Sequence, residues 1–186
     1  VEASGKYLTV RAAEERVVLP DGVYSNEINV GVYSPRALTL AFSAHTEMDG
    51  DDFDLAAEGV ALTADLSASD IYEEGEYGNI FRNGGSKLCL FRGPVENGRA
   101  AIPDGVTETS DDPFGELEFT ELYANDLEAL ILSSPWAQRL VRLRLGANTD
   151  PSSLPGKELL ALRSVETDEG DDGYTAAGGI LYKNGD

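Results

Sequence analysis

Basic side chains are what this sequence has least of relative to its acidic ones. Only 14 Lys and Arg residues face 34 Asp and Glu residues, which gives a formal net charge of −20 over 186 residues. Contacts to nucleic-acid phosphates need clustered lysine and arginine, so this charge argues against nucleic acid as a direct partner. The same repulsion disfavours an anionic membrane surface over most of the protein.

Cysteine and histidine are nearly absent, with Cys89 and His45 the single examples of each. One cysteine excludes an intrachain disulfide, and the two residues together cannot supply the usual ligand sets for zinc, iron or copper. His45 lies near Glu47 and Asp49, but the chain has no Gly-x-Ser-x-Gly nucleophile motif. We therefore interpret His45 as a lone surface histidine, and expect neither a cofactor nor an enzyme activity.

Long hydrophobic runs are also absent. The most apolar stretches, such as 129–132, are far shorter than the roughly 20 residues of a membrane-spanning helix. The N-terminus does not show the basic start and apolar stretch of a signal peptide. We expect a soluble chain.

The chain nevertheless contains 41% hydrophobic residues, so its charge does not indicate disorder. The Debye length falls from roughly 30 Å at 0.01 M salt to about 3 Å at 1 M, so concentrated salt screens self-repulsion of this kind. Ordinary hydrophobicity with extreme acidity therefore predicts a folded protein of a very salty environment. The length suits a single domain covering residues 1–186.

Short alternating segments separated by turn residues dominate the pattern. In segment 37–43, Leu38, Leu40 and Phe42 share one face, which is typical of a half-buried strand. The other segments of this kind are 7–11, 16–19, 60–66, 80–82, 87–92, 115–122, 138–145, 159–165 and 180–183. About nine or ten such strands predict an all-β sandwich or barrel.

Turn and helix signals complete this prediction. Asn83-Gly84-Gly85-Ser86 predicts a hairpin between 80–82 and 87–92. Segment 125–132 fits either a short helix or a strand, and Pro135 would stop it in both cases. No repeat of fixed period is present, which counts against solenoids and propellers.

Acidic residues are concentrated in four runs, at 47–54, 70–76, 108–121 and 166–172. Segment 48–54 resembles the start of a calcium loop, but Phe53 occupies the third ligand position. Segment 167–173 is equally acidic and equally unpatterned. We interpret both as solvated acidic loops rather than calcium sites.

Three arginines, Arg139, Arg142 and Arg144, lie within six positions of a chain that otherwise avoids basic residues. Two interpretations remain open: pairing with acidic loops of the same chain, or contact with an acidic partner subunit. Cys89 lies in the apolar run 88–91, which predicts a buried inert thiol. An intersubunit disulfide is the alternative, if that strand lies at a subunit contact.

The strand pattern that runs from Tyr7-Leu8-Thr9-Val10 through 37–43 and 88–91 to 140–145, in so acidic a chain, resembles a known family. It is similar to the smaller of the two major capsid proteins of haloarchaeal tailless icosahedral viruses with an internal membrane. The resemblance implies a single jelly-roll barrel of about eight to ten antiparallel strands with little helix, standing upright on the capsid.

The same resemblance implies a structural function in the virion. The chain would assemble with copies of itself and a companion jelly-roll capsid protein into capsomers, above a lipid layer, with no catalytic residues. The alternative is a haloarchaeal secreted or cell-surface β-sandwich module that binds glycan or calcium.

Overall fold

The structure is a computed structural model. The residues it describes are 2–4, 7–10, 15–25, 28–30, 36–53, 55, 57, 59–128, 135–146, 161–167, 174–177 and 180–183. Within these ranges β-strands are the main regular structure, and the one α-helix is the short α1 (Pro135–Gln138). The expectation of an all-β protein with little helix is confirmed.

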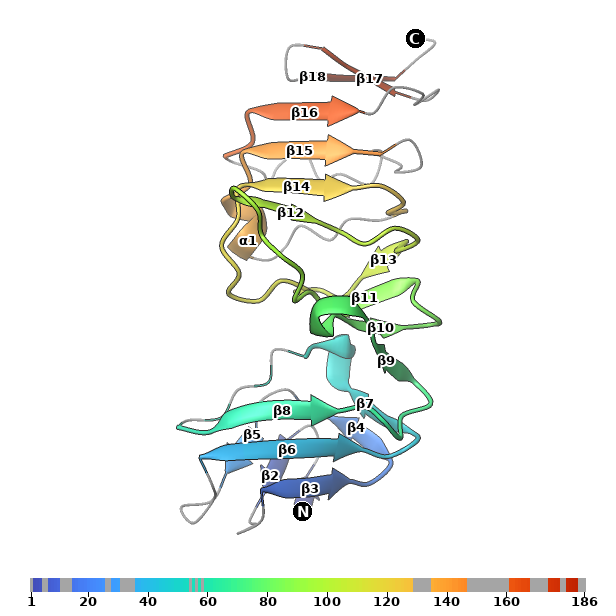
Figure 1. The fold of residues 1–186 in the computed structure, drawn as a ribbon, viewed down its shortest axis with the longest axis vertical. Helices are drawn as coiled ribbons and strands as arrows, with labels where there is room; N and C mark the ends of the chain where they lie inside the picture. The colour runs from blue at the N-terminus through green and yellow to red at the C-terminus, as the bar shows by residue number, and fades with distance from the viewer. Residues whose placement is uncertain are drawn as a thin grey trace.

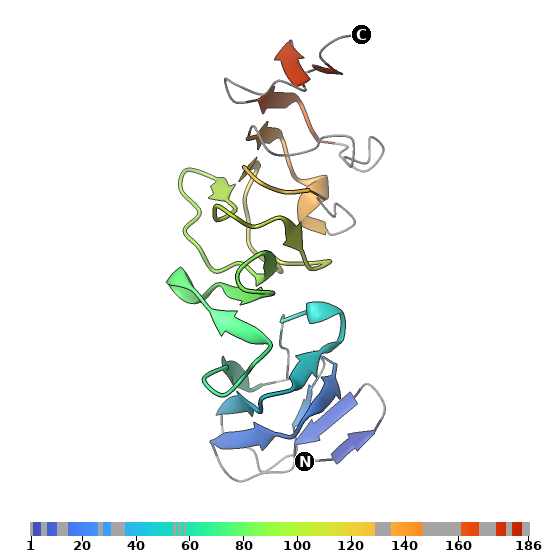
Figure 2. The same ribbon diagram turned by 90° about the vertical axis from the view of Figure 1, so that its right-hand side faces the viewer.

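The molecule is an elongated stack of short strands that lie across its long axis (Figures 1 and 2). Strands β2 (Tyr7–Val10) and β3 (Arg16–Leu19) lie at one end. The hairpin of β17 (Tyr174–Ala177) and β18 (Ile180–Lys183) lies at the other.

The N-terminal part consists of coils that add one strand to each of three parallel sheets. The first coil holds β2, β3 and β4 (Gly22–Tyr24), and the second holds β5 (Ile28–Val30), β6 (Ala37–Phe42) and β7 (Thr46–Met48). The strands pair in parallel as β2 with β5, β3 with β6, and β4 with β7. Strand β8 (Ala61–Asp65) extends the second sheet from β6, and β1 (Glu2–Ser4) adds to β2 in antiparallel direction.

The C-terminal part repeats this parallel stacking in one sheet. Its strands, in spatial order, are β12 (Arg99–Ala101), β14 (Glu121–Ala124), β15 (Arg142–Leu145) and β16 (Ser164–Thr167). Between the two parts lie the antiparallel strands β9 (Tyr72–Glu74), β10 (Ile80–Arg82) and β11 (Lys87–Leu90), with the short β13 (Glu108–Thr109) parallel to β11. The predicted hairpin is confirmed: β10 and β11 are antiparallel, and Asn83, Gly84 and Gly85 in the turn all have positive φ.

The parallel pairing differs from the antiparallel single jelly-roll that the family resemblance implies. Partners lie 20 to 24 positions apart along the chain, as Leu8 with Ile28 and Ala37 with Ala61 show, so the arrangement is solenoid-like. The antiparallel expectation is therefore wrong for these sheets, and so is the inference against a solenoid. Alternation of apolar and polar residues indicates which face of a strand is buried, but it does not indicate which other strand pairs with it. Because the coils differ in length, they leave no repeat of fixed period in the sequence.

Side-chain alternation produces the core as expected. Leu38, Leu40 and Phe42 of β6 are all buried, as the pattern predicted. An N-terminal cluster of buried side chains includes Phe42 and Cys89, and a C-terminal cluster includes Leu88 and Trp136. Because β11 contributes to both clusters, it joins the two halves of the stack.

Three segment predictions need correction. Residues 125–128 form no helix, and 129–132 lie outside the described residues. Pro135 begins α1 rather than ending an element, because the first turn of a helix does not use the missing N–H of proline. The strands predicted at 115–122 and 138–145 begin only at Glu121 and Arg142.

Candidate functional site

The exposed face of the β12–β14–β15–β16 sheet carries two of the three arginines that the sequence singled out. The parallel register aligns side chains in two rows, the first being Arg99, Glu121, Arg142 and Ser164, and the second Ala101, Tyr123, Arg144 and Glu166. The opposite face is buried, with Leu122 and Leu143 in the core. Each arginine thus has an acidic or aromatic neighbour on the next strand, which avoids like charges at one strand spacing.

The arginines make contacts within the chain. Arg142 Nη1 lies 3.1 Å from Glu121 Oε1, and the guanidinium carbon of Arg144 lies 5.1 Å from the centre of the Tyr123 ring. Arg139 lies outside the strand, just after α1, with Nη1 3.8 Å from Glu118 Oε1. Intrachain pairing is therefore present. Exposed pairs of this kind contribute only about 0.2–1 kcal/mol, so they can exchange their carboxylate for that of another chain.

The structure decides between the two interpretations of Cys89, a buried inert thiol or a contact between subunits. Cys89 lies fully inside the N-terminal core cluster. Its burial, with the charge of Asp51, raises the pKa of the thiol to about 12. A thiol in this position cannot reach another subunit, so the structure favours the buried inert cysteine.

A second polar cluster surrounds Asp51, at the end of the short turn η1 (Asp49–Asp51). The Asp51 carboxylate is buried and accepts hydrogen bonds from the Tyr72 hydroxyl at 2.7 Å, Arg82 Nη1 at 2.6 Å and Lys87 Nζ at 2.5 Å. Arg82 Nη2 also donates to Glu47 Oε2 at 2.9 Å. This ionic cluster ties the last N-terminal coil to the β9–β10–β11 sheet.

The ionic cluster revises the interpretation of the acidic segment 48–54. Asp51 is neither a solvated loop residue nor a calcium ligand in this structure, because protein cations already occupy its oxygens. The sequence contained one signal for this: Lys87 is one of only four lysines, and it follows a hairpin turn. Nothing in the linear pattern connected it to Asp51, 36 positions away.

The ionic cluster predicts a distinct pH dependence. Burial raises the pKa of Asp51, but the hydrogen bonds from Lys87, Tyr72 and Arg82 outweigh it and leave the pKa below its ordinary 3.8. Since the unfolded chain then binds the proton more tightly, this contribution to stability is full above about pH 4 and is lost as the pH falls through the folded-state pKa. We expect the Asp51→Asn variant to lose less stability than wild type between about pH 5 and pH 2, measured by urea unfolding at each pH. Equal losses in both proteins would contradict this assignment.

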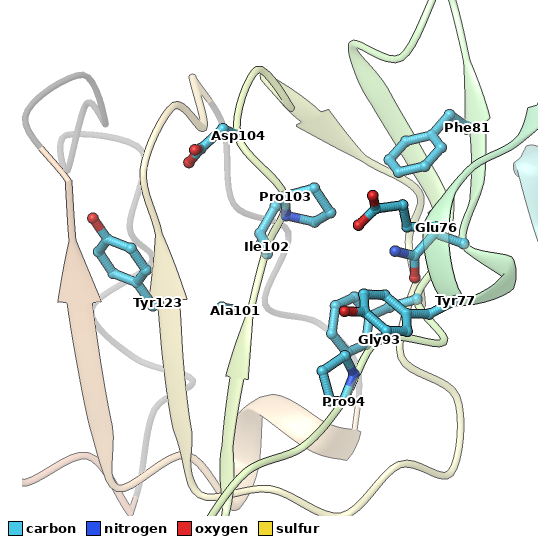
Figure 3. Close-up of a pocket in the computed structure, with 12 residues that line it drawn as sticks. Glu76, Tyr77, Phe81, Gly93, Pro94, Ala101, Ile102, Pro103, Asp104 and Tyr123 are labelled. Carbon is cyan, nitrogen blue, oxygen red and sulfur yellow. The ribbon is translucent and has the colours of Figure 1, made fainter.

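A pocket of about 520 Å³ lies where the β9–β10–β11 sheet meets the edge of the β12–β14 sheet. Its lining residues are Glu76, Tyr77, Asn79, Phe81, Phe91, Gly93, Pro94, Ala101, Ile102, Pro103, Asp104 and Tyr123. Figure 3 shows Tyr77 beside Gly93 and Pro94 on one side, and Tyr123 beyond the segment 101–104 on the other. No sequence pattern predicted this pocket, because a turn, a strand end and a loop from separate parts of the chain enclose it.

Tyr77 has an unusual backbone for its residue type. The turn η2 (Glu76–Gly78) places Tyr77 at φ 62°, ψ 9° and Gly78 at φ 79°, and the N–H of Asn79 donates to the Glu76 carbonyl. These are the features of a type I′ turn, whose central positions favour Asn, Asp and Gly. Tyr77 is 68% exposed, so packing within the chain does not explain a tyrosine there.

The remaining predicted residue, His45, is exposed, and its backbone N–H donates to Asp21 Oδ1 at 3.1 Å. In the part of the chain that the structure describes, no three His, Cys, Asp or Glu side chains gather closely enough to hold a metal ion. No helix in the same ranges is long and apolar enough to cross a membrane.

Comparisons with protein-family models, curated proteins and solved structures found no match to this chain.

Proposed function

We propose that this chain is a structural subunit that works in concentrated salt. It would assemble with copies of itself and a companion capsid protein into capsomers of an icosahedral shell, as the haloarchaeal capsid proteins it resembles do. The localisation proposed is the virion, above the internal membrane of the particle.

The division of charge over the molecule is the observation that supports this proposal most. The buried carboxylate of Asp51 is matched by two cations, whereas acidic residues such as Glu73, Glu96 and Glu108 lie exposed in a chain of net charge −20. Such a surface repels copies of itself in dilute salt and permits contact once salt screens it. Self-association that requires a high salt concentration suits a shell subunit of a halophilic virus.

The proposal does not depend on an upright jelly-roll, which the parallel sheets do not resemble. A stack of coils meets the same physical need, because each coil satisfies the backbone hydrogen bonds of the next and the whole forms a rigid rod. Contacts between rods would then come from side-chain faces. The arginine-bearing face of the β12–β14–β15–β16 sheet is the best candidate, because its guanidinium groups complement the acidic surface of another copy.

Self-association tests this proposal. In about 3 M KCl we expect the chain to sediment as species larger than its 19.9 kDa monomer. The double variant Arg142→Gln, Arg144→Gln should weaken this association about tenfold, because two exposed cations facing a second acidic copy are lost. Sedimentation velocity over a range of protein concentrations measures both.

Arg16→Gln is the matched control. Arg16 is also an exposed arginine in an ion pair, with Asp65 at 2.7 Å, but it lies on β3 at the far end of the stack. Its replacement should leave association unchanged. A folded chain that stays monomeric in molar salt at every concentration would overturn the proposal.

The alternative function, a secreted or cell-surface binding module, gains support from one observation, the aromatic pocket around Tyr77. A binding pocket is compatible with a shell subunit, so the two functions do not exclude each other.

A further inference from the structure

We propose that the pocket between η2 and the edge strand β12 binds a neutral saccharide, with the Tyr77 ring as the stacking surface and the Glu76 carboxylate as an acceptor for sugar hydroxyls. Asp104 adds negative charge to the pocket, but its Oδ1 already accepts a hydrogen bond from Asn125 Nδ2 at 3.2 Å. This goes beyond a shell function, because it gives the subunit a ligand of its own. It would allow a particle or a secreted protein to attach to a glycan-bearing surface.

The backbone at Tyr77 is the first argument. A bulky residue in the left-handed region is strained, and such strain persists mainly at functional sites. Asn or Gly would fit this type I′ position without strain. A tyrosine that is both strained and 68% exposed contributes little to stability, so its ring is better explained by an external contact.

The charge of the pocket is the second argument. None of its lining residues is basic, and both charged ones, Glu76 and Asp104, are acidic. An anionic ligand such as a phosphate or a sulfated glycan would therefore be repelled, locally and by the net charge of −20. The ligand must be neutral or cationic.

The shape and chemistry of the walls are the third argument. The lining of the pocket is mostly apolar, and its apolar residues include Pro94, Ile102 and Pro103. A volume of about 520 Å³ lies within the usual range of roughly 300–1,000 Å³ for small-molecule sites. A pyranose ring matches this combination, because it offers an apolar C–H face to an aromatic ring and hydroxyl donors to carboxylates, which only accept hydrogen bonds.

A cationic ligand fits the same walls less well in concentrated salt, and this step rests on the proposed function. Glu76 and Asp104 are exposed, so at about 1 M salt their field extends only about 3 Å and abundant metal ions compete for it. Hydrogen bonds and ring stacking act at contact distance and survive these conditions. The saccharide is therefore the ligand class that the pocket favours.

The binding test uses the full chain in about 3 M KCl with neutral tetrasaccharides built on glucose, mannose, galactose or N-acetylglucosamine. Saturation-transfer NMR and titration should detect binding of at least one. Tyr77→Ala should weaken that binding at least about tenfold, the order expected for loss of a stacked ring. Tyr77→Phe should stay within about twofold, because it keeps the ring.

Two further variants control for general effects. Glu76→Gln keeps the shape of the side chain but weakens its acceptor, and it should reduce affinity severalfold. Val23→Ala removes another exposed apolar side chain far from the pocket and should change nothing.

A stability measurement gives a readout that does not require the ligand. Glycine takes the left-handed region freely, so Tyr77→Gly should raise the Tm by about 1–3 °C while abolishing saccharide binding. Tyr77→Ala should bring no such rise, because alanine has the same backbone restriction as tyrosine. A fall in Tm for Tyr77→Gly would show that the ring serves stability and would overturn the argument.

Three other outcomes would overturn the proposal: no tetrasaccharide binds to the folded chain, binding is equal in wild type and Tyr77→Ala, or tetramethylammonium binds in a Tyr77-dependent way while the saccharides do not. The single variant Arg142→Gln leaves the pocket lining intact, because Arg142 pairs with Glu121 and neither residue lines the pocket. Loss of self-association in this variant with retained saccharide binding would thus separate the two proposals.

Discussion

Replacing Asp51 by asparagine should lower the free energy of unfolding by about 3 kcal/mol. Removing one partner from a buried ionic cluster leaves the others uncompensated, which typically costs about 3–5 kcal/mol. Here Arg82 and Lys87 would lose the carboxylate that both contact, and their side chains are 29% and 21% exposed, so water recovers part of the loss. The loss of unfolding free energy in Asp51→Asn should therefore lie at the lower end of this range. Urea unfolding at neutral pH in concentrated salt measures it.

Glu47→Gln is the matched control, since Glu47 contacts the same Arg82 at 2.9 Å but is 35% exposed. Its loss should lower stability by less than about 1 kcal/mol. A double-mutant cycle between Asp51→Asn and Arg82→Gln should show strong coupling, because each variant removes the same contact. Similar effects for Asp51→Asn and Glu47→Gln would contradict the central role of the buried Asp51 carboxylate in the ionic cluster.

Transfer from about 3 M KCl to about 0.05 M should unfold the chain or most of it. A net charge of −20 on a 186-residue chain repels itself over the whole molecule once the Debye length exceeds 10 Å. A folded protein has a net stability of only about 5–15 kcal/mol, so unscreened repulsion between its carboxylates is large enough to unfold it. Circular dichroism should lose the β signal as salt is removed, and the emission of Trp136, the single tryptophan and fully buried, should shift to the red.

Neutralising exposed carboxylates should lower the salt needed for folding. Changing Glu73, Glu96 and Glu108 to glutamine removes three exposed negative charges and no ion pair among those described above. Replacing these glutamates with lysines would also create new ion pairs, so the effect of removing negative charge could not be measured alone. Complete native structure of the wild-type chain at about 0.05 M salt would contradict the halophilic interpretation and weaken the shell proposal that depends on it.

The sequence predicted those local features that depend on the residue types at a few neighbouring positions. Leu38, Leu40 and Phe42 share a buried face because strand geometry alternates side chains, whatever the partner strand. The segment 83–85 forms a hairpin turn because Asn and Gly tolerate positive φ. These predictions required no knowledge of distant residues.

Features that depend on distant partners were missed or assigned wrongly. The parallel pairing of β6 with β8 joins residues 24 positions apart, such as Ala37 and Ala61, and no local pattern distinguishes it from a hairpin or a jelly-roll crossover. The interpretation of Pro135 as an end signal is wrong, because proline is also favoured at the first position of a helix, where α1 begins. The pocket around Tyr77 has no linear signature, because its walls come from separate turns and strands.

By itself, then, the sequence determined the all-β class, the buried face of β6, one hairpin and an extreme net charge. These follow from periodicity, turn chemistry and composition, which are properties of neighbouring residues or of the whole chain. The tertiary structure alone decided which strands pair, that Asp51 is buried against Arg82 and Lys87, and where a pocket forms. Each of these depends on long-range contacts, whose energy is gained only after the chain has folded back on itself.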